Sequence, residues 1–407
     1  MKNFLIITNY YKDSEARLTN RIKEYIEKKG GSCSTFFSNG ETPGEAAPHR
    51  EDIPENTQGV LVLGGDGTLI RAAAALVKSR LPLIGVNLGT LGYLCELEEK
   101  DVFAEQVRTV TLYAFDDNNN LVYQKTDEGE PLSEGDYAMN VIGIDPSQYR
   151  LVVWAGLNDE SFAVPLLYPN QAKIDELTVK TLRKQAPRST SEDEKDQYIV
   201  DNSLYSLWHG EVKKGPTTRS GRQQITNVSL VKNTNTIHVI VAQVNQSNGP
   251  ITKALTEETF QCAIYDDNGY MNYDNSLLED NLLTYKPYNT KAEVVTTRAF
   301  SAENEPAKEY NGITCDVSVA RLMKGQTPEL TIKNSQTQEV LFHSDDLIKY
   351  FEEVDAEKYK DRNYSLQEYL DREDEYTIKI FVDEKLALIK TVIDVNDWII
   401  QINDIEL

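Results

Sequence analysis

A glycine-rich loop is the part of this 407-residue sequence best suited to chemistry. It follows the continuous apolar stretch 59–63 and consists of Gly64, Gly65, Asp66, Gly67 and Thr68. Glycines let backbone N–H groups approach a phosphate closely, and the helix that follows such a loop presents its N-terminus to the same anion. The loop is therefore a candidate phosphate site.

Asp66 needs a separate explanation, because a carboxylate repels phosphate. It could act as a general base on a hydroxyl nucleophile, or it could hold a cation. The alternative is a tight strand-to-helix turn in which Asp66 is the N-cap of the helix. A second motif, residues 87–93, begins at Asn87 and ends at Tyr93 after another apolar stretch. The loop residues by themselves leave both interpretations open.

The elements around these motifs alternate between strands and helices. We expect strands at residues 3–8, 33–37, 59–63 and 81–86, and helices at 14–29 and 69–78. Such alternation with apolar strands predicts a parallel, doubly wound α/β sheet with helices on its faces. The glycine loop then lies at the carboxyl end of a parallel strand, where doubly wound sheets bind phosphates.

The hydrophobic pattern changes after Phe103. Residues 106–115 alternate between apolar and polar side chains and end in the turn 116–120, and similar short strands recur to the C-terminus. This pattern indicates β-sandwiches, with helices expected only at residues 170–184, 344–351 and 365–371. We therefore predict a multidomain chain, in which a doubly wound α/β half-domain precedes mainly-β tandem sandwiches. The predicted domains are 1–103, 104–249 and 250–407.

The net charge of -23 limits the partners of this chain. Residues 1–103 hold 12 Lys and Arg against 14 Asp and Glu, whereas the remainder holds 30 against 51. The second piece therefore carries nearly all the acidity. An acidic surface repels phosphate backbones, so we expect no nucleic-acid partner.

Cysteine and histidine usage gives no sign of a metal centre. The four cysteines and four histidines are widely spaced, so we expect neither a metal site nor a disulfide framework. No stretch of about 18 apolar residues predicts a transmembrane segment. The N-terminal apolar run is too short for a signal peptide, which predicts a cytoplasmic location for the chain as written.

The two glycine-containing motifs together resemble the NAD kinase family, and residues 1–103 look like its N-terminal domain. The resemblance implies that Asp66 contacts the ribose hydroxyl to be phosphorylated and that Tyr93 stacks on adenine. ATP or NAD would bind here, with contacts from Gly64, Gly65, Gly67, Thr68 and Asn87. That family's later Asn-Glu pair and further acids have no counterpart after Phe103, so half of the expected active site is missing.

Residues 104–407 resemble the FimB-type fimbrial anchor family of Bacteroidetes. The resemblance lies in the segments 103–116, 151–156, 207–210, 228–238 and 265–274. It implies a location at the cell surface or outer membrane, no required cofactor, and fimbrial subunits held by strand or edge contacts. The family's first strand is missing here, so we expect an open sheet edge along residues 106–115 or its neighbour, where an extended segment would pair.

Three functions follow from these features. The favoured one is a non-enzymatic fimbrial anchor or adhesion protein with an incomplete kinase-like half, because the second piece lacks acids, His or Cys at catalytic spacing. The second is an NAD kinase that phosphorylates the ribose 2'-hydroxyl of NAD with ATP, using Asp66 as the base. The third is an inert nucleotide-binding module. Sequence leaves open whether the join near Phe103 is a natural fusion or an artificial join of two genes.

Overall fold

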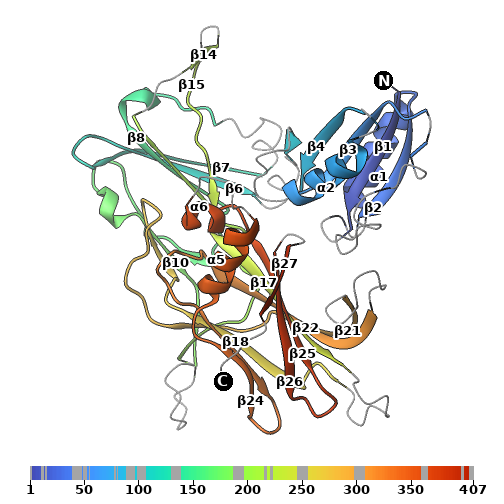
Figure 1. The fold of residues 1–407 in the computed structure, drawn as a ribbon. Coiled ribbons are helices and arrows are strands. Elements are labelled where there is room, and N and C mark those ends of the chain that lie inside the picture. The colour runs from blue at the N-terminus through green and yellow to red at the C-terminus, as the bar shows by residue number, and fades with distance from the viewer. Residues whose placement is uncertain are drawn as a thin grey trace. The chain divides into compact units, whose positions relative to one another are not determined.

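In the computed structural model, the chain forms two compact units (Figure 1). One unit combines residues 1–102 with 294–311 and 392–407, and the other combines 103–293 with 312–391. The structure describes residues 2–402 apart from 11–12, 14–15, 39–47, 49–52, 55, 78, 80, 89–96, 99–106, 130–138, 187–196, 215–217, 221–222, 245–254, 298–307, 359–364 and 396–397.

The N-terminal sheet is parallel and has the strand order β2-β1-β3-β4-β5. Its elements are β1 (Asn3–Asn9), α1 (Arg17–Lys28), β2 (Ser32–Ser38), β3 (Gly59–Gly64), α2 (Asp66–Leu76), β4 (Leu83–Asn87) and β5 (Leu97–Glu98). One face of the sheet packs Leu5 and Val62 against Ala72 of α2. The other packs Ile6 and Leu63 against Ile22 of α1. Helices therefore cover both faces, which confirms the doubly wound half-domain.

A five-stranded sheet follows, in the order β16-β13-β8-β6-β7. Its strands are β6 (Thr109–Phe115), β7 (Leu121–Glu128), β8 (Arg150–Ala155), β13 (Trp208–Lys213) and β16 (Val231–Lys232). Strand β6 pairs with β7 on one side and with β8 on the other. The first alternative, an open edge along residues 106–115 themselves, is wrong, because β7 pairs with one side of β6 and β8 with the other. The second alternative, an open edge on the neighbouring strand, remains, because β7 is an outer strand. The outer strands are β7 and β16.

The remaining strands form three further sheets and a hairpin. Their orders are β19-β10-β9, β11-β12-β20-β18-β23-β24 and β21-β22-β17-β25-β26-β27, with β14 and β15 as the hairpin. The strands are β9 (Phe162–Ala163), β10 (Thr178–Thr181), β11 (Lys184–Gln185), β12 (Tyr198–Val200), β14 (Thr218–Ser220), β15 (Gln223–Ile225), β17 (Thr234–Gln243), β18 (Phe260–Asp266), β19 (Tyr270–Asn272), β20 (Leu283–Tyr285), β21 (Asn289–Thr297), β22 (Lys308–Ala320), β23 (Glu329–Asn334), β24 (Val340–Ser344), β25 (Glu375–Val382), β26 (Leu388–Val395) and β27 (Trp398–Ile402).

Strands from both sides of residue 250 share sheets. Strand β12 pairs with β20, and β17 pairs with β25, both in parallel. A boundary at 249/250 therefore does not separate two independent sandwiches, because these pairings join segments that lie far apart in the sequence. The residues at the boundary itself lie outside the described part of the chain.

Helix is scarce in the β-rich part of the chain. The described helices there are the single turns η2 (Pro146–Gln148) and η3 (Ile174–Glu176), then α5 (Leu347–Lys358) and α6 (Leu366–Leu370). The expected helix over 170–184 is wrong, because most of that segment is the turn η3 followed by β10 and β11. Among the described residues, no helix is long and apolar enough to cross a membrane.

Candidate functional site

The glycine loop lies where strand β3 ends and helix α2 begins. Gly64 is paired with Asn87 at the carboxyl ends of β3 and β4. The backbone N–H of Leu88 also donates to the Gly64 carbonyl oxygen at 3.0 Å. The loop and the start of the second motif are thus side by side at the carboxyl edge of a parallel sheet, where doubly wound folds bind ligands.

Gly64 is required by the packing of Thr68. A Cβ atom added at Gly64 would lie 2.6 Å from the Thr68 Oγ1 atom. Thr68 is buried, and its Oγ1 accepts a hydrogen bond of 3.4 Å from Asn9 Nδ2 at the end of β1. The Thr68 hydroxyl therefore already ties α2 to β1, and a contact between Thr68 and a nucleotide stays a prediction.

Helix α2 has no side-chain cap at its N-terminus. Its N-cap is Gly65, with φ -89° and ψ -176°, and Asp66 is the first helical residue. The alternative interpretation of Asp66 as the N-cap is therefore wrong. The first N–H groups of a helix have no partner within the helix and attract anions. A phosphate placed at this turn would meet such donors.

Helix α1 differs, because a carboxylate already occupies its N-terminus. Asp13 accepts hydrogen bonds from the backbone N–H of Leu18 at 3.2 Å and of Thr19 at 2.9 Å, and from Thr19 Oγ1 at 2.6 Å. Thr19 Oγ1 also contacts Thr8 Oγ1 at 2.6 Å. Sequence reasoning missed this buried polar group. An acid just before a helical pattern is the signal that could have revealed it.

Some of the residues predicted to contact nucleotide lie wholly or partly outside the described residues. The backbones of Asp66, Gly67 and Asn87 are placed, but the side chains of Asp66 and Asn87 are outside the described part, as is all of Tyr93. Their predicted roles toward nucleotide stay predictions. No group of three or more His, Cys, Asp or Glu that could hold a metal ion is found among the described residues.

Two titratable groups of the second unit have notable environments. Asp266 is buried, which raises its pKa to about 7, and its Oδ2 has no partner among the described residues. His238 Nδ1 lies 2.7 Å from Asp316 Oδ1, and Asn289 donates to Asp316 Oδ2 at 2.6 Å. Neither group adjoins a nucleophile at catalytic distance in the hydrogen bonds described.

Strand β7 is the longer outer strand of the five-stranded sheet. At its start, the Leu121 N–H donates to Ala172 O at 2.9 Å, and the Asn170 N–H donates to Leu121 O at 2.7 Å. From Val122 to Glu128 no strand of the described chain pairs with its outer side. This stretch can therefore accept an added strand through its backbone.

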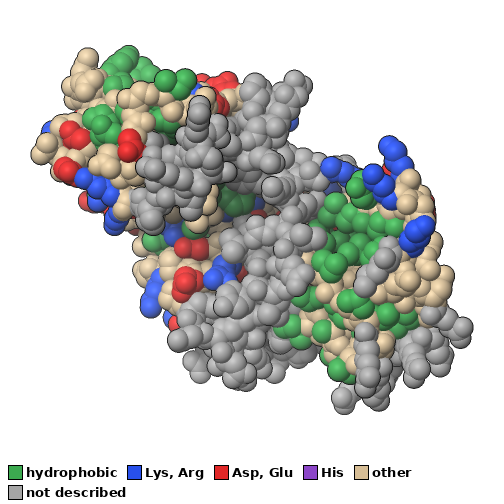
Figure 2. All heavy atoms as spheres, turned by 90° about the horizontal axis from the view of Figure 1, so that it is seen from above, with side chains coloured by type: hydrophobic (Ala, Val, Ile, Leu, Met, Phe, Trp, Pro, Cys, Tyr) green, Lys and Arg blue, Asp and Glu red, His purple; other side chains and the backbone are tan. Residues whose placement is uncertain are grey.

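Charge on the visible surface is mixed. On the face shown in Figure 2, the charged side chains of the described residues do not gather into a broad basic surface. The described side chains in this view therefore give no sign of the basic patch that a phosphate backbone needs.

The described residues form a mainly-β sandwich protein with an α/β domain before it. The family model of the fimbrillin-A associated anchor proteins Mfa1 and Mfa2 matches residues 92–404, so the chain belongs to this family. A second family model, that of the ATP-NAD kinase N-terminal domain, matches residues 4–111.

Individual relatives divide in the same way. The NAD kinase of Agathobacter rectalis is 56% identical over 103 residues, which are 25% of this chain and 36% of that enzyme. The chain thus spans about a third of the length of that kinase. Two structures from Bacteroides thetaiotaomicron, each 27% identical, cover 74% of this chain and 92% of their own. One is described as a candidate adhesin, with TM-score 0.55, and the other as a candidate polysaccharide-binding protein, with TM-score 0.52.

These similarities confirm the predicted division of function. The fimbrial anchor fold makes up most of the chain, and the kinase-like part is an incomplete half confined to residues 4–111. Binding of nucleotide by that half is untested and stays a prediction.

Proposed function

We propose that this protein is a cell-surface fimbrial anchor that holds fimbrial subunits by strand pairing and catalyses no reaction. The observation that carries the proposal is the match of the anchor family over residues 92–404, together with the mainly-β sheets built by that region. An anchor of this kind needs no cofactor. Its work is done by backbone hydrogen bonds at a sheet edge and by side chains that fit the partner.

The topology argues against kinase activity. After β5, the next strand of the described residues is β6, which belongs to the five-stranded antiparallel sheet and not to the parallel N-terminal sheet. Phosphoryl transfer depends almost entirely on positioning and on electrostatic stabilisation of the transferred group. A chain that spans 36% of a related kinase supplies only part of that positioning.

Strand β7 is the edge that we assign to the partner. The stretch from Val122 to Glu128 is long enough for several backbone hydrogen bonds with an added strand, whereas β16 at the opposite edge has two residues. We therefore place a strand of a fimbrial subunit along β7.

Proline substitutions at two neighbouring positions test this edge. N–H groups alternate in direction along a strand, so one of the two substitutions Lys125→Pro and Thr126→Pro removes an N–H that points away from β6. The other removes an N–H that points toward β6. The variant that keeps the wild-type melting temperature should lose binding of a fimbrillin subunit in surface plasmon resonance. Undiminished binding by that variant would exclude β7 as the partner's edge.

Nucleotide binding without catalysis is the second candidate function. The uncapped N-terminus of α2 beside the end of β4 favours it. Isothermal titration with ATP and with NAD on the full chain tests it, and Asp66→Ala is the matched variant. Heat of binding without formation of NADP would support this second function, and no heat with either nucleotide would remove it.

A further inference from the structure

Residues 266–276 contact strands of several different sheets within the second unit. This segment, here called the hub, begins at the last residue of β18 and contains β19. At its start, Asn268 Nδ2 donates to the carbonyl oxygens of Ala320 at 3.2 Å and Arg321 at 3.1 Å. The Tyr285 hydroxyl donates to Asn268 Oδ1 at 2.5 Å. One asparagine thus connects the end of β22 with β20.

The middle of the hub reaches the five-stranded sheet. His209 of β13 is buried, and burial lowers its pKa to about 4, so it is neutral at physiological pH. Its Nε2 lies 2.8 Å from the Tyr273 carbonyl oxygen, which makes Nε2 the protonated nitrogen and the donor. The guanidinium of Arg150 on β8 lies 5.8 Å from the centre of the Tyr273 ring. Met271 is fully buried and pairs with Val179 of β10.

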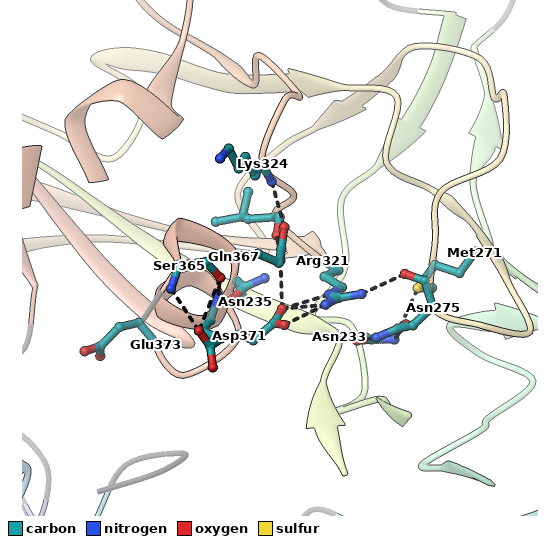
Figure 3. A network of polar contacts seen from close by, with 12 residues as sticks. Asn233, Asn235, Met271, Asn275, Arg321, Lys324, Ser365, Gln367, Asp371 and Glu373 are labelled. Atoms are coloured by element: carbon teal, nitrogen blue, oxygen red, sulfur yellow. Dashed lines mark hydrogen bonds and ion pairs between the residues drawn. The ribbon is translucent and has the colours of Figure 1, made fainter. Parts of the chain in front are cut away.

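The end of the hub is held by a network of side chains (Figure 3). Asn275, with φ +67°, exchanges side-chain hydrogen bonds with Asn233 at 2.5 and 3.1 Å. Its carbonyl oxygen accepts from Arg321 Nη1 at 2.7 Å. Arg321 is 7% exposed and donates to both carboxylate oxygens of Asp371 at 2.7 Å. Gln367 Nε2 donates to the same carboxylate at 2.8 Å, which attaches α6 to the network.

The chemistry of these contacts makes separation of the sheets unfavourable. Loss of the hub would leave the buried Arg321 with one acceptor fewer and the buried Asn233 amide without its partner. A buried charge or amide that loses its partner retains the full cost of its removal from water. Each sheet that contacts the hub is therefore stabilised by the presence of the others.

We infer that the hub makes the five-stranded sheet and the β18-containing sheet unfold and refold together as one cooperative unit. A force applied to one sheet is then transmitted to the other. The alternative is two sandwiches that unfold independently. Because all the contacts lie within the second unit, the inference does not require that the protein binds fimbriae. The coupling by the hub is tested by hydrogen exchange, whereas the anchor function is tested by binding of a fimbrillin subunit. One proposal can therefore fail while the other holds.

Hydrogen exchange of the full chain, read by mass spectrometry, tests the coupling. In the wild type, the slowest amides of β8 and β18 should report the same opening equilibrium, because sheets that unfold together share one free energy of opening. In Asn275→Gly, which removes the side-chain pair with Asn233 but keeps a residue suited to positive φ, the two sets should separate by at least about tenfold in exchange rate.

Asn119→Gly is the matched control, because Asn119 has φ +62° and lies in the β6–β7 turn outside the hub. It should leave the free energies of opening of β8 and β18 equal. Arg321→Lys is the second variant, since it retains the charge but loses the planar fork that reaches Asp371 and Asn275 together. It should separate the two sets as Asn275→Gly does. Unequal free energies of opening in the wild type, or an equal fall of both free energies in both variants, would contradict the proposed coupling.

Discussion

His238 and Asp316 form an ion pair whose strength depends on pH. Burial alone lowers the pKa of His238, but the hydrogen bond to Asp316 and the nearby carboxylates of Glu375 and Glu293 outweigh it and raise the pKa. For Asp316, burial acts upward on the pKa, and hydrogen bonds from His238 and Asn289 outweigh it and lower the pKa. A histidine with a raised pKa stabilises the fold fully below its unfolded value of about 6.5 and loses that effect as pH rises through the folded value.

We expect His238→Gln to destabilise the protein more at about pH 5.5 than at about pH 8.5. The difference should be on the order of 1 kcal/mol, because the side chain is only partly removed from water. Thermal unfolding at both values measures it. Equal losses at the two values would show that the pKa of His238 is the same in the folded and the unfolded protein.

Asp266 also makes the protein less stable as pH rises, but over a lower pH range. Burial, followed by the neighbouring charge of Asp267, raises its pKa to about 7. The folded protein therefore holds a proton that the unfolded chain releases near pH 4, so stability falls as pH rises from about 4 to about 7. An uncharged residue of the same shape at position 266 would avoid this fall in stability with rising pH.

Asp266→Asn should raise stability at pH 8 by about 2–4 kcal/mol and change it little at pH 4. The substitution keeps the oxygen that accepts the Asp267 N–H at 2.9 Å. Urea unfolding at both values measures the effect, with Asp267→Asn as the control at a neighbouring carboxylate. A variant less stable than the wild type at pH 8 would mean that the Asp266 carboxylate has a stabilising partner.

At the scale of elements, the turn between β3 and α2 depends on Gly64. We expect Gly64→Ala to destabilise the N-terminal unit by about 1–3 kcal/mol, because the new Cβ overlaps the buried Thr68 side chain. Gly65→Ala is the control, since φ -89° suits any residue. Hydrogen exchange in β3 is the measurement, and protection unchanged by Gly64→Ala would show that α2 shifts to accept the methyl group.

Prediction of individual elements succeeded where the hydrophobic period was clear. The strands at the start of the chain and α2 match the structure closely, because their apolar faces pack on the local β-α-β arrangement. Residues 170–184 were expected to be helical, but Val179 is fully buried in β10 and pairs with Met271. A distant partner strand overrides local helical spacing there.

At the scale of the whole molecule, the incomplete kinase half should lack turnover. We expect the purified full chain to form no NADP from ATP and NAD above background, because only part of the positioning groups is present. A coupled NADP assay with the Agathobacter rectalis kinase as the positive control measures this. Turnover near about 1 per second, within the range of ordinary enzymes, that is abolished in Asp66→Ala would restore the enzyme interpretation.

The sequence by itself determined the class of each part of the molecule. Apolar strands alternating with helices required a doubly wound sheet before Phe103, and period-two segments required β-sandwiches after it. The resemblance of the Gly64 loop and the Asn87 motif to the NAD kinase family implies part of a kinase-like site, and the roles of its residues stay a prediction. These features are local, since each depends on residues that are close together in the chain.

Only the tertiary structure decided which strands are neighbours. It placed β6 inside its sheet, joined β12 to β20 and β17 to β25 across residue 250, and brought Asn233, Asn275 and Arg321 into one network. Pairing between distant strands depends on the fit of side chains from both strands, and the cost of closing the intervening loop changes little with loop length. Local patterns therefore specify that strands exist, whereas the packing of the whole chain selects their partners.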